Sequence, residues 1–262
     1  MTNPRDHATH PHRVEAHAAT DSAGAPWQER ILHPSGFEAD TGQSDPALVA
    51  AIAGEDDMVL MSAVASGRFL VAVVPHAQEI VTDERGLAHD PSVEMALVTL
   101  TAPDGRRAIP AFTGIAELAH WDPAARPVPV TADKLAQAAV SEGCEVIVLD
   151  LDQPHARELR PSQVWALAMD RPWSPPERDS FVDAAVGRVV AREGEVTAYR
   201  RYAADPPGTL GVELTLVPGL DRASVTALVT RIGEQLATDG EFRARIDGLA
   251  FRIAGSVVPA GE

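Results

Sequence analysis

The 262-residue sequence predicts an α/β protein of the α+β type, in which two small domains follow a mobile N-terminal tail. Three observations predict it. Apolar strands and capped helices alternate between Met95 and Asp152, a Pro-dense break follows at residues 171–176, and a second run of strands and helices follows that break. Each domain is therefore expected to contain a mixed or antiparallel sheet covered by helices.

Residues 1–44 form the predicted tail, because they are rich in His, Ala, Pro, Thr and Asp and contain few large apolar side chains. Such a composition buries too little surface to offset the entropy lost on ordering. Four histidines in the tail suggest metal binding as an alternative: His7, His10, His12 and His17. A flexible segment has no fixed ligand geometry, so we expect a solvated tail without a bound metal.

The first domain is expected over residues 45–170. Asp45 followed by Pro46 is typical of a helix N-cap and first helical position, and Gly54 ends this helix. Apolar runs and turn residues assign the segments that follow: strands at 58–65 and 68–75, and a polar loop at 76–92.

The segment from Met95 to Asp152 has the clearest pattern. Asp104-Gly105 is a strong hairpin signal, and Thr131 and Gly143 are suited to the two ends of a helix. Prolines hold the segment around Val128 extended. The expected elements are strands at 95–101, 106–112, 126–130 and 145–149, and helices at 114–121, 131–142 and 161–169.

The second domain is expected over residues 178–258, after the break that begins at Arg171. Apolar side chains recur at helical spacing after Asp221, which is a good N-cap, and alternate in the last strand. The expected order is helix 178–192, strands 195–203 and 209–217, helix 221–236 and strand 249–253.

The net charge of −16 is concentrated in residues 45–170, where 8 basic and 19 acidic residues give −11. This field repels nucleic-acid backbones and anionic lipid, so neither is an expected partner. No apolar run approaches the length that spans a bilayer, and the N-terminus lacks the apolar core of a secretory signal. We therefore expect a cytoplasmic location. One Lys against 21 Arg is typical of a high-GC, actinobacterial-like composition.

Several stretches between residues 45 and 170 resemble the SseB family, which is named for enhanced serine sensitivity. They are Ile109-Pro-Ala-Phe-Thr113, Leu118 with Trp121, Arg126-Pro127, Glu142-Gly143 and Val146-Ile-Val-Leu149. Residues 178–258 resemble the C-terminal-type domain of the same family. The resemblance implies a soluble bacterial protein with no established catalytic activity. The family's strand tends to run into Asn-Pro, whereas here it runs into Asp150-Leu-Asp152.

Asp150 and Asp152 suggest one alternative function, a metal-dependent, phosphatase-like hydrolase. An apolar strand that ends in Asp-x-Asp is how haloacid-dehalogenase-like phosphatases present a nucleophile and an acid beside Mg²⁺, and two carboxylates can share a hard cation. That chemistry also needs a downstream cation and further acids. The only Lys, Lys134, lies upstream, and no Asp-Asp pair follows.

Cys144 is the only cysteine, which excludes an internal disulfide and a multi-Cys zinc site. Its neighbours Glu142 and Glu145 would raise the pKa of its thiol, so a buried, unreactive side chain is expected. The common nucleotide-binding and hydrolase motifs are absent, and no cofactor is expected.

Four residues are the candidate ligand- or partner-binding surface: Phe112, Thr113, Trp121 and Arg126. A Trp at a helix end and an Arg before Pro could frame a groove, although the two aromatic rings could equally belong to the core. The sequence thus favours a non-enzymatic binding or regulatory protein whose partner is a protein or a small molecule. A secretion-associated adaptor is a further alternative, and the oligomeric state is not predicted.

Overall fold

The computed structural model describes residues 36–76 and 94–254. The chain divides into two compact units, residues 1–40 and residues 41–262, and the second unit contains both sheets. The expectations for residues 1–35, including the four histidines, and for the loop from 77 onwards lie outside the described residues.

A seven-stranded mixed sheet forms the centre of the first domain. Its strands are β1 (Arg68–His76), β2 (Glu94–Leu97), β3 (Leu100–Thr101), β4 (Arg107–Phe112), β5 (Arg126–Thr131), β6 (Val146–Leu149) and β7 (Arg157–Leu159). The main order is β2-β1-β4-β6-β7, while β3 pairs with β4 and β5 pairs with β1. Strands β4 and β6 are parallel and the other pairs are antiparallel, so the predicted α+β class is confirmed.

Helices cover both faces of this sheet. They are α1 (Pro46–Ala53), α2 (Asp57–Ala65), α3 (Ile115–Trp121), α4 (Ala132–Ser141) and α5 (Pro161–Ala168). Ile109 and Ala111 of β4 join the large core beneath α1, α2, α4 and α5, whereas Phe112 joins a smaller cluster with Leu118 of α3. This division follows from the alternation of side chains along a strand.

The segment at 58–65 is a helix, and the predicted strand is wrong. The Asp56 carboxylate accepts hydrogen bonds from the backbone N–H groups of Met58 (2.8 Å) and Val59 (3.3 Å), which makes it the N-cap. The buried side chains, Leu60, Met61 and Val64, follow helical spacing instead of strand alternation.

Other boundaries differ in smaller ways. The strand expected at 95–101 is divided into β2, which pairs with β1, and β3, which forms the hairpin with β4 around Asp104-Gly105. The three-residue strand β7 was not predicted. Gly143 has the left-handed φ of +65° expected at a helix end, while the Thr131 hydroxyl donates to Asp133 and caps no backbone group.

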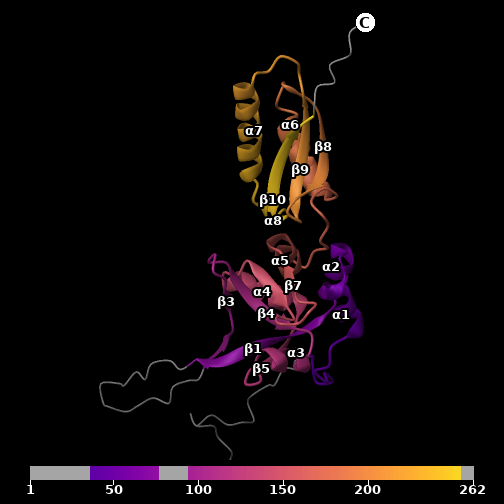
Figure 1. Cartoon of the computed structure of the whole chain (residues 1–262), viewed down its shortest axis with the longest axis vertical. Coiled ribbons are helices and arrows are strands. Elements are labelled where there is room, and N and C mark those ends of the chain that lie inside the picture. Colours follow the sequence, from indigo (N-terminus) through magenta and orange to yellow (C-terminus); the bar gives the residue numbers. More distant parts are fainter. Residues whose placement is uncertain (1–35, 77–93, 255–262) are drawn as a thin grey trace, which may run out of the picture. The chain divides into compact units, whose positions relative to one another are not determined.

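The second sheet contains β8 (Val196–Ala204), β9 (Thr209–Leu216) and β10 (Gly248–Ile253), in the order β10-β9-β8. Strands β9 and β10 are parallel, and β8 and β9 are antiparallel. Helices α6 (Ser180–Val190) and α7 (Arg222–Ala237) pack on it, and Figure 1 shows α7 running alongside its strands. The predicted α-β-β-α-β order gains one short helix, α8 (Gly240–Ala244).

The Pro-dense break after α5 is attached to the first domain. Trp173 is only 8% exposed and belongs to the core beneath α2 and α5, and its indole N–H donates to the Ser162 hydroxyl at 3.2 Å. Asp247, just before β10, accepts hydrogen bonds from Arg160 (3.0 Å) and from the Ser162 backbone (2.8 Å).

Among the described helices, none has the length and apolar character needed to cross a membrane.

Candidate functional site: a polar turn and an apolar groove

Two parallel strands bring Thr113 and Asp150 together at one edge of the first sheet. Thr113 follows β4 and Asp150 follows β6, and the ends of neighbouring parallel strands share an edge. The Asp150 carboxylate is fully buried and accepts hydrogen bonds from the Thr113 backbone N–H (2.7 Å) and hydroxyl (2.9 Å). Its backbone has a left-handed φ of +47°, which Asp tolerates better than most residues.

Three further polar side chains extend this cluster. His155 Nε2 lies 3.0 Å from the second carboxylate oxygen of Asp150, and the Ser44 hydroxyl lies 3.2 Å from that of Thr113. Ser44 donates its proton to Glu117 at 2.7 Å. A nucleophilic hydroxyl needs a base as its hydrogen-bond partner. Here each hydroxyl has a carboxylate partner, and the imidazole contacts the Asp150 carboxylate, so the cluster links chain segments that lie far apart in the sequence.

The two aspartates of the Asp-x-Asp sequence do not converge. Asp150 is buried with its oxygens occupied by Thr113 and His155, whereas Asp152 is exposed. The described residues contain no group of three or more His, Cys, Asp or Glu side chains that could hold a metal ion. A cation at Asp150 would have to displace its protein donors.

The four residues of the candidate surface divide between interior and exterior. The rings of Phe112 and Trp121 lie 5.4 Å apart, within the small cluster beneath α3, and Phe112 is completely buried. Thr113 is buried in the polar cluster. Trp121 is partly exposed and Arg126 is exposed, so these two side chains reach the surface. The single cysteine, Cys144, is buried, and burial raises the pKa of its thiol.

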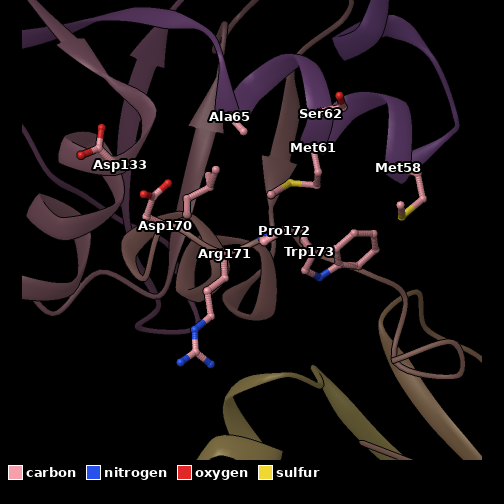
Figure 2. A pocket seen from close by; sticks show the side chains of 10 residues that line it. Met58, Met61, Ser62, Ala65, Asp133, Asp170, Arg171, Pro172 and Trp173 are labelled. Carbon is pink, nitrogen blue, oxygen red and sulfur yellow. The ribbon is translucent and has the colours of Figure 1, made fainter. Parts of the chain in front are cut away.

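A groove of about 560 Å³ lies beside α2, and the sequence did not predict it. Its walls come from α2, the first turn of α4, the end of α5 and the segment after it (Figure 2). The lining residues are Met58, Met61, Ser62, Ala65, Asp133, Leu167, Asp170, Arg171, Pro172 and Trp173. Two features of the structure that form it differ from the expectation: α2 is a helix where a strand was predicted, and residues 171–173 of the predicted break line the groove. The Asp56 cap of α2 was the signal available in the sequence.

Apolar side chains form most of this groove. Met61, Leu167 and Trp173 are buried and fix its floor, while Met58 is 44% exposed at its rim. Asp57, at the start of α2, holds the helix in place because Arg157 and Arg160 each donate to its carboxylate at 2.7 Å. The groove therefore has a rigid base and one adaptable, exposed thioether at its edge.

Two carboxylates lie at the other end of the groove. Asp133 accepts a hydrogen bond from the Thr131 hydroxyl, which lowers the pKa of its carboxyl. Asp170 is exposed, has a φ of +51°, and its side chain has no hydrogen-bond or ion-pair partner among the described residues. Arg171 points away from both in Figure 2 and pairs with Glu241 at 2.8 Å.

Comparison with protein families identifies the first domain. Residues 45–166 match the SseB protein N-terminal domain. The first domain is an SseB N-terminal domain. The polar cluster lies largely within the match. Because the match ends before Leu167, the groove combines α2 and α4 of this domain with residues that follow it. The C-terminal-type domain expected over 178–258 is not confirmed. No curated protein and no solved structure matches the chain.

Proposed function

We propose that this is a non-enzymatic, cytoplasmic binding or regulatory protein of the SseB type, and that its groove receives a segment of a partner protein. The observation that carries the proposal is the open apolar groove beside α2, where Met58 is exposed above the buried Met61 and Trp173. Its volume of about 560 Å³ is within the range of ligand pockets. Trp, Met and Arg, all present in its lining, are enriched at protein interfaces.

The chemistry of the groove supports binding more than catalysis. Among the described residues that line it, Ser62 has the one hydroxyl group and none is a His. Met side chains adapt to differently shaped apolar partners, which is why they recur on surfaces that bind protein segments. Trp121 and Arg126 are a second proposed contact surface, because both reach the exterior near the start of β5.

Site-specific photo-crosslinking tests the proposal. A benzophenone amino acid would replace Met58 in the full chain, and Met169, which is 51% exposed and does not line the groove, would be replaced in a matched control. We expect a protein adduct from position 58 that position 169 does not give, in cells that express the chain. Equal adducts at both positions, a small-molecule adduct alone, or no adduct at position 58 would contradict a protein-binding groove.

A further inference from the structure

We propose that the groove selects a segment in which a basic side chain lies near a bulky apolar one. This inference rests on the proposed function and specifies its partner. Figure 2 shows the carboxylates of Asp133 and Asp170 at one end of the groove and Met58 and Trp173 at the other. An occupant that fills the groove therefore meets an acidic end and an apolar end at the same time.

The charged groups around the acidic end leave a carboxylate available. Lys134 Nζ lies 3.9 Å from Asp133 and also contacts Gln137 at 3.1 Å, so Asp133 has a partial counter-ion. The guanidinium of Arg171 is paired with Glu241. Asp170, in contrast, has no side-chain partner among the described residues. A Lys or Arg of the bound segment would supply its missing positive charge.

The two ends would contribute in different ways. Apolar burial against Met58, Met61 and Trp173 supplies most of the affinity, because it removes apolar surface from water. An exposed ion pair with Asp170 adds little affinity, but it sets the direction of the segment and disfavours acidic competitors. The charge of −11 over residues 45–170 adds long-range attraction for a basic partner.

Three labelled model peptides separate these contributions in a fluorescence anisotropy titration of the full chain. The Leu–Lys peptide contains Leu and Lys. The Leu–Glu peptide replaces every Lys with Glu, and the Ser–Lys peptide replaces every Leu with Ser. We expect the Leu–Lys peptide to bind at least about tenfold more tightly than either of the others. Equal binding of the Leu–Lys and Leu–Glu peptides would overturn selection for a basic side chain.

Paired variants locate the binding in the groove. Asp170→Asn should weaken binding of the Leu–Lys peptide by about two- to fivefold, which is the effect expected of an exposed ion pair. Glu145→Gln removes an exposed carboxylate of the same domain outside the groove and should have no such effect. Met58→Gln should weaken binding by about fivefold or more, whereas Met169→Gln should not.

The outcomes distinguish this inference from the proposed function. If Met58→Gln weakens binding but Asp170→Asn does not, the groove binds segments without reading a basic side chain, and only the inference is wrong. If the Ser–Lys peptide binds equally well, or Glu145→Gln matches Asp170→Asn, the attraction is a general charge effect and the inference is overturned. If Met58→Gln changes nothing and position 58 yields no adduct, the proposed function also fails.

Discussion

The turn after β6 and the groove beside α2 each contain an aspartate with a left-handed backbone, yet the two carboxylates have opposite surroundings. Asp150 is buried and receives hydrogen bonds from Thr113 and His155. Asp170 is exposed and has no side-chain partner among the described residues. The same residue type in the same conformation stabilises the fold at one position and is available to a ligand at the other.

Asp150→Ala should produce the largest effect. The substitution leaves the Thr113 donors and His155 without their buried partner and places Ala in a left-handed conformation. We expect the free energy of unfolding to fall by about 3–5 kcal/mol, as for the removal of one partner of a buried charged network. Urea denaturation measures it. A loss below about 1 kcal/mol would show that the hydrogen bonds of Asp150 contribute little to the stability of the fold.

Gly114→Ala tests the other side of the polar cluster. A Cβ atom at this position would lie 2.3 Å from the Ser44 hydroxyl oxygen and 2.9 Å from the Ser44 backbone nitrogen, so the chain would have to shift. We expect a loss of about 1–3 kcal/mol in the free energy of unfolding. Gly240→Ala is the matched control, because its Cβ would meet no atom within 4 Å, and it should be nearly neutral.

Asp57→Asn tests the support of the groove. Burial raises the pKa of Asp57, but the hydrogen bonds and charges of Arg160 and Arg157 outweigh it and hold that pKa below its ordinary value of 3.8. The stabilisation is therefore complete above about pH 5 and is lost as the pH falls towards the lowered pKa. We expect Asn to destabilise the chain by about 1–2 kcal/mol at neutral pH.

The difference between wild type and Asp57→Asn should shrink in denaturation curves recorded below pH 4, because protonation removes the same charge that the substitution removes. A difference that stays constant down to pH 3 would mean that the ion pairs with Arg157 and Arg160 contribute nothing to stability.

Asp170→Asn should have the smallest effect on stability and thus sharpens the contrast with Asp150. Asn tolerates a left-handed backbone, and the Asp170 side chain has no partner to lose among the described residues. We expect a change within about 0.5 kcal/mol, as for most surface substitutions. A loss comparable to that of Asp150→Ala would show that Asp170 is structural, and it would then be unsuitable as a ligand contact.

Local signals in the sequence predicted much of the fold. Asp104-Gly105 located the β3–β4 hairpin, and Asp221 located the start of α7. The apolar run after Met58 was ambiguous, because a short apolar run fits a buried strand or a buried helix equally well. The Asp56 side chain is the feature that favours a helix, because it accepts a hydrogen bond from a backbone N–H group of the first helical turn.

The site was harder to predict because it depends on pairing between distant segments. Thr113 and Asp150 were each identified separately, but their contact requires that β4 and β6 be parallel neighbours. Local patterns do not state which strands are adjacent. The groove likewise depends on Trp173 packing beneath α2, although its proline-rich surroundings are typical of a linker.

The prolines of β5 restrict how any partner can approach this sheet. Strand β5 pairs only with β1 among the described strands, and a proline fits within a strand only where its missing N–H would face outwards. Pro127 and Pro129 therefore remove hydrogen-bond donors from that edge. A second chain cannot extend the sheet there by β-augmentation, which protects this edge against aggregation and requires that recognition beside Arg126 use side chains.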